Sequence, residues 1–110
     1  MVKPGEIYFV KNAKLGSCLD GRPCVVLAVR GETSLVYYLS SQFDSSADAE
    51  ITLLKTDPDF AASGLKKDSY IPAIDEVRKP TAEFEKAKLL GHATGEFKKK
   101  IEALYGAPLE

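Results

Sequence analysis

The chain has 110 residues, of which 45% are hydrophobic and 28% charged, and its formal net charge is −1. This composition is typical of one globular domain over residues 1–110, with a core that needs no disulfide or metal support. The charge balance excludes a strongly basic nucleic-acid coat, although the fifteen Lys and Arg residues can still gather in a local groove.

Signals for targeting or cofactor binding are few. No apolar run approaches the roughly 20 residues of a membrane span, and residues 1–6 lack the apolar core of a signal peptide. Two cysteines, Cys18 and Cys24, are too few for a disulfide scaffold or a zinc site of the usual pattern. The sequence contains no P-loop, GxGxxG or HExxH pattern. We therefore expect a cytoplasmic protein with no membrane partner, no cofactor and no metal.

The first half of the chain predicts a strand, a loop and a hairpin. Residues 5–10 are typical of a strand, and residues 11–21 of a long loop with several turn residues. A hairpin is predicted over residues 21–39, where two apolar runs flank the polar connection Gly31–Ser34. The first run is nearly continuous, which indicates a strand buried on both faces, with Cys24 as a core thiol.

Short elements follow, separated by turn residues and prolines. They are a solvated acidic segment at 43–50, a strand at 51–54, a turn at 57–59, a helical turn or loop at 60–64 and a strand at 69–71. Pro72 limits the last strand, and Pro80 breaks the chain again. Residues 84–90 fit a strand and a helix equally well.

The C-terminal segment has the spacing of an amphipathic helix. Phe97, Ile101 and Leu104 recur at i, i+4 and i+7, with Thr94 placed as the N-cap and Gly106 as the stop. The predicted fold class is therefore mainly β with α, a small β-barrel or curled sheet with a C-terminal helix.

Polar residues mark one end of the predicted hairpin. Arg22 precedes its first strand, and Ser40, Ser41 and Gln42 follow its second, so antiparallel pairing makes them neighbours. A guanidinium can bind a phosphate through two hydrogen bonds and stabilise charge that develops on it. A surface ion pair for Arg22 and turn-closing hydroxyls for the serines are the alternatives.

A second polar cluster lies further along the chain. Lys66 and Lys67 offer cations to a phosphate backbone, and Asp68, beside Ser69, offers a carboxylate as a general base. A solvated loop is the alternative here. His92 is the one histidine and a candidate general acid, for which a loop or capping role is the simpler interpretation.

Two sequence elements are, in combination, fairly specific to one known protein family. They are Gly-Glu-Ile-Tyr in Pro4–Val10 and Arg-Pro-x-Val-Val-Leu in Gly21–Leu27. Together with Leu39–Gln42, Ser63–Ile71 and the ending from Leu89–Gly91 onward, they resemble the MazF/PemK-type toxins of bacterial toxin–antitoxin systems. The resemblance covers most of the chain.

The resemblance implies an SH3-like β-barrel with a C-terminal helix, usually a homodimer. It implies a metal-independent endoribonuclease, an mRNA interferase that cleaves single-stranded RNA by 2′-hydroxyl attack and is inhibited by a cognate antitoxin. By position, Arg22 matches the arginine that stabilises the scissile phosphate, and Ser40 matches the hydroxyl residue, commonly Thr, that contacts it. The secondary contacts to RNA would be Ser41, Gln42, Lys67, Asp68 and Ser69.

Residues 15–20 and 72–79 depart from the usual pattern of that family. With the near-neutral charge, these departures also fit a non-catalytic SH3-like module that binds RNA or protein. A structural subunit that acts only through a partner chain is a third interpretation.

Overall fold

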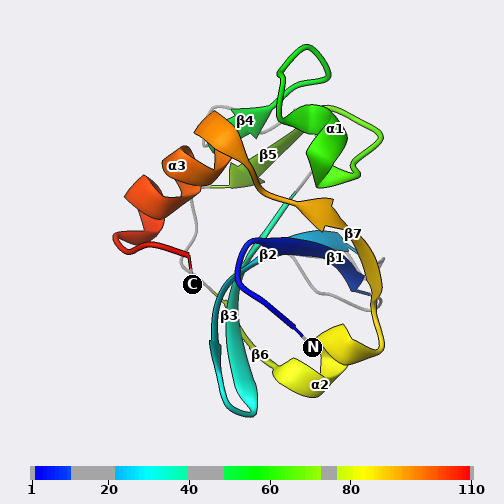
Figure 1. The fold of residues 1–110 in the computed structure, drawn as a ribbon, viewed down its shortest axis with the longest axis vertical. Coiled ribbons are helices and arrows are strands. Elements are labelled where there is room, and N and C mark those ends of the chain that lie inside the picture. Colours follow the sequence, from blue (N-terminus) through cyan, green and yellow to red (C-terminus); the bar gives the residue numbers. More distant parts are fainter. Residues whose placement is uncertain (1, 11–21, 40–48, 73–76, 110) are drawn as a thin grey trace.

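The computed structural model describes residues 2–10, 22–39, 49–72 and 77–109. These residues form seven strands in two antiparallel sheets, with three helices (Figure 1). The strands are β1 (Glu6–Val10), β2 (Arg22–Arg30), β3 (Thr33–Tyr38), β4 (Ala49–Leu53), β5 (Ser69–Pro72), β6 (Val77–Pro80) and β7 (Lys88–His92). The helices are α1 (Phe60–Ser63), α2 (Thr81–Glu85) and α3 (Gly95–Tyr105).

The larger sheet has the strand order β6-β3-β2-β1-β7, and β2–β3 is its central hairpin. The predicted hairpin is thereby confirmed, with a shorter turn than expected because Thr33 and Ser34 belong to β3. Gly31 opens this turn with φ of +65°, a conformation that glycine adopts without steric cost. The strands predicted at 5–10, 51–54 and 69–71 are also present, as β1, β4 and β5.

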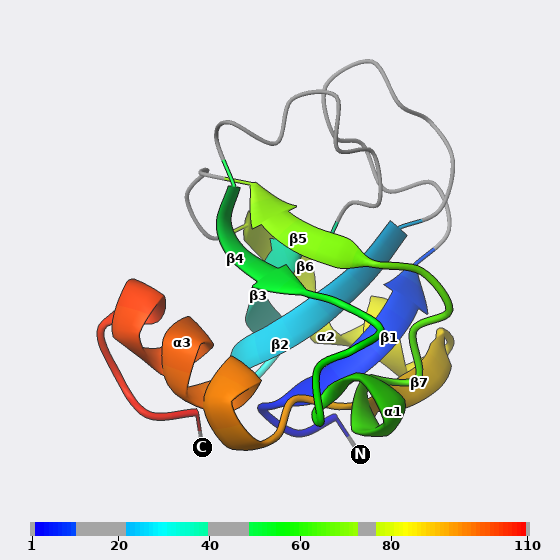
Figure 2. The ribbon, with the colours of Figure 1, turned by 90° about the horizontal axis from the view of Figure 1, so that it is seen from above.

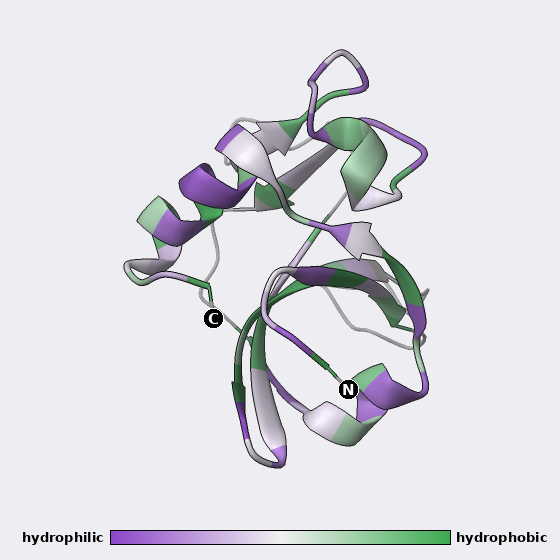
Figure 3. Ribbon diagram, in the orientation of Figure 1, coloured by the Kyte–Doolittle hydropathy of each residue, from purple (hydrophilic) through white to green (hydrophobic). Residues whose placement is uncertain are grey.

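Each face of the larger sheet is covered, as the continuous apolar run of β2 predicts. Ile7, Val25 and Leu27 face the core that β4, β5 and α3 cover, whereas Tyr8 and Val26 face a second core closed by α2. Figure 2 shows the β4–β5 pair lying over β2. In Figure 3 the hydrophobic colour follows β2 and β3, and hydrophilic residues occupy much of α3. Cys24 is fully buried in the second core, as predicted.

The segment from Val77 to His92 differs most from the sequence-based expectation. Val77–Pro80 pairs with β3 as an edge strand, although no strand was predicted there. Residues 84–90, which were ambiguous, divide between the end of α2 and the start of β7. Edge position explains the missed strand, because an edge strand tolerates proline and none of these four residues is fully buried.

Helix α3 packs against β4 and buries Phe97 and Ile101 in the first core. Leu104 was predicted on the same face, yet it is 37% exposed, and in the last turn it is Tyr105 that packs against this core. Thr94 takes the N-cap position but makes no side-chain capping bond of its own. None of the described helices has the length and apolar character needed to cross a bilayer.

Candidate functional site

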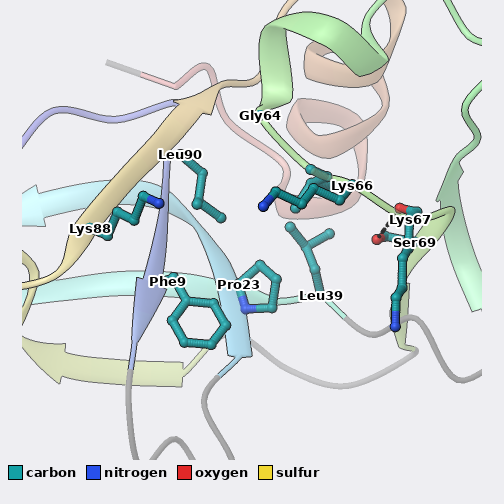
Figure 4. Close-up of a pocket in the computed structure, with 10 residues that line it drawn as sticks. Phe9, Pro23, Leu39, Gly64, Lys66, Lys67, Ser69, Lys88 and Leu90 are labelled. Carbon is teal, nitrogen blue, oxygen red and sulfur yellow. Dashed lines mark hydrogen bonds between the residues drawn. The ribbon is translucent and has the colours of Figure 1, made fainter.

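A cavity of about 410 Å³ opens where β1, β2 and β7 approach the segment that joins α1 to β5 (Figure 4). Apolar side chains and lysines share its lining, which consists of Phe9, Pro23, Leu39, Gly64, Leu65, Lys66, Lys67, Ser69, Lys88 and Leu90.

Neighbouring strands build the apolar part of this cavity. Phe9 of β1 is paired with Pro23 of β2 on one side and with Lys88 of β7 on the other. Side chains directly opposite in adjacent strands share a face of the sheet, so these three form one row. Leu39 extends the row, since its N–H donates to the carbonyl of Pro23 at 2.9 Å.

Three exposed lysines surround the cavity. Lys66 and Lys67 precede β5, and Lys88 begins β7. In Figure 4 the side chains of Lys66 and Lys88 extend toward one another over the cavity, and Lys67 extends away from them. The ion pairs within the described ranges involve Lys79, Lys99 and His92, and none involves these three lysines. An anion placed between Lys66 and Lys88 would relieve the repulsion between these two cations.

A backbone contact between α1 and β7 fixes one wall of the cavity. Gly64 ends α1 with φ of +73°, and a Cβ there would overlap the carbonyl of Leu90. A Cβ on Gly91 would overlap the carbonyl of Ala62 in the same way. The two glycines therefore let the helix end and the strand touch directly, which places Gly64 and Leu65 beside Leu90 in the cavity wall.

The predicted catalytic residues, Arg22 and Ser40, are next in the chain to two residues that line this cavity. Arg22 is the first residue of β2, paired through its backbone with Val10, and its side chain lies outside the described residues. Ser40, Ser41 and Gln42 also lie outside them. Pro23, which follows Arg22, and Leu39, which precedes Ser40, are joined by a backbone hydrogen bond and line the cavity.

The second predicted cluster is divided by the structure. Lys67 and Ser69 line the cavity, and the buried Ser69 hydroxyl donates to the carbonyl of Lys67 at 2.9 Å. Asp68 is not part of the lining, and its Oδ1 accepts the backbone N–H of Lys55 at 2.6 Å. The structure thus groups Lys67 and Ser69 with the cavity, and Asp68 with the turn that follows β4.

The simpler interpretation placed His92 in a loop or a helix cap, but the structure places it in strand β7. It ends β7, where its Nε2 is 3.8 Å from Oε2 of the buried Glu6. The other oxygen of Glu6 accepts the Tyr8 hydroxyl at 2.8 Å. Burial, together with this hydrogen bond, raises the pKa of Tyr8 to about 12. Neither His92 nor Glu6 lines the cavity, so this pair forms a separate cluster.

Phe9 and Lys88 are cavity residues that the sequence did not single out. Phe9 reads as one more apolar strand residue, and Lys88 lies in the segment whose secondary structure was ambiguous. Their pairing joins the first strand of the chain to the last, and no local pattern signals it.

The sequence matches no family model and no curated protein. Within the described ranges, no group of three or more His, Cys, Asp or Glu side chains is arranged to hold a metal ion. The geometry of the cavity therefore supplies the argument about function.

Proposed function

We propose that the cavity binds single-stranded RNA and that the protein is a metal-independent endoribonuclease of the MazF/PemK toxin type. One observation carries this proposal: three exposed lysines surround an apolar cavity lined by Pro23 and Leu39, the chain neighbours of Arg22 and Ser40. Cations and apolar surface in one cavity match the two chemical components of a single RNA strand, its phosphates and its bases.

The lysines and the apolar row would divide the work of binding. Lys66 and Lys88 extend over the cavity and can contact phosphate oxygens. The ring of Phe9, beside Pro23, offers a flat surface to an unstacked base. A duplex keeps its bases stacked inside, so this combination favours a single strand.

The proposed reaction is attack of a ribose 2′-oxygen on the adjacent phosphorus. The P–O5′ bond breaks, a 2′,3′-cyclic phosphate forms, and the proton lost by the 2′-hydroxyl is balanced by the proton gained on the 5′-oxygen. Arg22 would stabilise the additional negative charge on the phosphoryl oxygens, and Ser40 would position the phosphate or relay the proton. Ser41, Gln42, Lys67 and Ser69 would contact the RNA around the cleaved bond.

We also propose the barrel, the dimer and the antitoxin partner that the resemblance to these toxins implies. The two sheets would form an SH3-like barrel, and two chains would pair as a cytoplasmic homodimer. A cognate antitoxin would inhibit the enzyme by occupying the RNA site. Size-exclusion chromatography with light scattering tests the dimer directly.

The deciding experiment incubates the purified protein with a long single-stranded RNA in EDTA. We expect discrete fragments that end in 2′,3′-cyclic phosphate, with the rate lowered about a hundredfold or more in Arg22→Ala. Arg30→Ala is the matched control, because Arg30 is an exposed arginine at the opposite end of the same strand. Normal cleavage by Arg22→Ala would refute the assigned mechanism. RNA that is bound but left intact by the wild type would favour the non-catalytic binding module.

A further inference from the structure

A second hollow adjoins the candidate site. Its volume is about 610 Å³, and it lies between the end of β1, the start of β7 and helix α2. Its lining is Phe9, Val10, Lys79, Glu83, Lys86, Ala87 and Lys88. Phe9 and Lys88 line both hollows, so the two meet at this cross-strand pair.

Strand alternation explains how one pair of residues serves both hollows. Ile7 faces the first core and Val10 faces the second, so the two sides of β1 lead to different sides of the sheet. Phe9, which is half-buried, stands at the rim between them. An extended ligand that leaves the first cavity can therefore pass over Phe9 and Lys88 into the second hollow.

Lysines dominate the charge of the second hollow. Lys79 is already compensated, because its Nζ lies 3.3 Å from Glu83 and also bonds the Tyr38 hydroxyl. Burial alone would lower the pKa of Lys79, but the Tyr38 and Glu83 interactions outweigh it and raise that pKa. Lys86 and Lys88 are exposed and take part in none of the ion pairs found in the described ranges. Among the described residues, the hollow therefore presents two cations without an ion-pair partner beside an aromatic ring.

We propose that the single-stranded RNA bound in the first cavity continues over Phe9 into the second hollow. This inference rests on the proposed function, and it identifies the substrate as a strand long enough to span both hollows. Phe9 stacks on a base at the junction, while Lys88 and Lys86 contact the phosphates that follow it. A single strand bends easily around the rim of a sheet, whereas a duplex resists bending over such a short length.

Binding measurements with oligonucleotides of two lengths test this path. The probes are fluorescent single-stranded RNAs of about 4 and about 12 nucleotides, within the usual range for one small domain. Their riboses carry 2′-O-methyl groups, so that no 2′-hydroxyl can attack and binding is measured without cleavage. Fluorescence anisotropy over a series of salt concentrations gives both the affinity and its dependence on salt.

Lys86→Ala tests the second hollow, and Lys99→Ala is its matched control. Lys99 is an exposed lysine on α3, outside the lining of both hollows. We expect the wild type to bind the longer RNA more tightly, and Lys86→Ala to remove much of that gain. Its slope of log affinity against log salt should fall by about 0.7 for the longer RNA only. Lys99→Ala should behave as the wild type.

Phe9→Leu tests stacking at the junction, and Phe9→Tyr keeps the ring. We expect about a tenfold loss of affinity for the longer RNA in Phe9→Leu and near-normal affinity in Phe9→Tyr. Circular dichroism of each variant establishes that the fold is retained. Equal losses in the two variants would contradict stacking.

The outcomes separate this inference from the proposed function. Tight, salt-dependent RNA binding that ignores both length and Lys86→Ala overturns the continued path and leaves the first cavity as the RNA site. No binding of either RNA by the wild type overturns the proposed function and this inference together. Binding of a poly-glutamate peptide that depends on Lys86, when RNA binding does not, assigns the second hollow to an acidic protein partner and overturns the inference.

Discussion

Asp59 lies in a turn, yet its carboxylate caps the distant helix α3. Its Oδ2 accepts the N–H of Phe97 at 3.3 Å, and its Oδ1 accepts the hydroxyl of Thr94 at 3.1 Å. Gly95 makes room for this arrangement, because a Cβ there would overlap the Asp59 carboxylate. The cap predicted for Thr94 is therefore supplied through a second residue, and it ties the turn before α1 to the C-terminal helix.

We predict that Asp59→Ala lowers the free energy of unfolding by about 1 to 2 kcal/mol, since the N–H of Phe97 loses its acceptor. Asp59→Asn keeps an oxygen acceptor and should lose clearly less. Urea denaturation followed by circular dichroism measures both values. Equal losses in the two variants would show that charge, rather than the capping hydrogen bond, makes the contribution.

Cys24 makes the stability of the protein sensitive to high pH. The thiol is fully buried, and burial raises its pKa from 9.0 to about 12. The unfolded chain ionises first, so the stabilisation is complete below pH 9 and is lost as the pH rises toward 12. Tyr8, with its raised pKa, adds a loss in the upper part of the same range.

We predict that Cys24→Ala costs about 1 kcal/mol at neutral pH but flattens the decline in stability that begins above pH 9. Denaturation of both proteins at neutral pH and between pH 9 and pH 12 measures the difference. Parallel declines in the wild type and the variant would exclude the thiol as the source.

At the scale of elements, the contact between α1 and β7 shapes the cavity. Gly91 has no positive φ that would call for glycine, so it is the lack of room for a Cβ that requires glycine at this position. Backbone atoms of Ala62 and Ser63 occupy the place that a Cβ would take. The packing of α1 against β7 thus depends on the absence of a methyl group at Gly91, as it does at Gly64.

We predict that Gly91→Ala lowers the free energy of unfolding by about 3 kcal/mol, because backbone atoms must move apart. It should also weaken the proposed RNA binding, since Gly64 and Leu65 belong to the cavity wall. Gly31→Asn is the control, because a Cβ there meets open space and Asn tolerates a positive φ. A stable Gly91→Ala protein with normal binding would contradict the role of this contact.

At the scale of the molecule, two cores share one sheet. The first contains Ile101 of α3, and the second contains Phe84 of α2, and both side chains are fully buried. The central strands β2 and β3 contribute to each core, so loss of either core removes one face of the same hairpin. The two faces should therefore unfold together.

We predict that Ile101→Ala costs about 2 to 5 kcal/mol and Phe84→Ala about 3 to 5 kcal/mol, each with a single transition. Tyrosine fluorescence and circular dichroism, recorded through the same denaturation, should coincide in both variants. Separate transitions for the two probes would show that the cores unfold independently.

Local chemistry explains which parts of the fold were predictable. The β2–β3 hairpin has a continuous apolar run and a glycine turn, and the α1 stop has Gly64, so each is encoded within a few residues. The edge strand at Val77–Pro80 and the boundary near Lys88 depend on pairing with distant strands. Propensity within a short window carries no information about such partners.

The sequence by itself determined the β-rich class and the buried β2–β3 hairpin, whose two ends lie side by side at Pro23 and Leu39. Only the tertiary structure decided that Phe9 and Lys88 meet, that Asp68 turns to Lys55, and that Asp59 caps α3. The physical reason is the separation along the chain over which each kind of interaction acts. Hydrophobic pattern and turn chemistry act between residues close in the chain, whereas a cavity is made by side chains that only folding brings together.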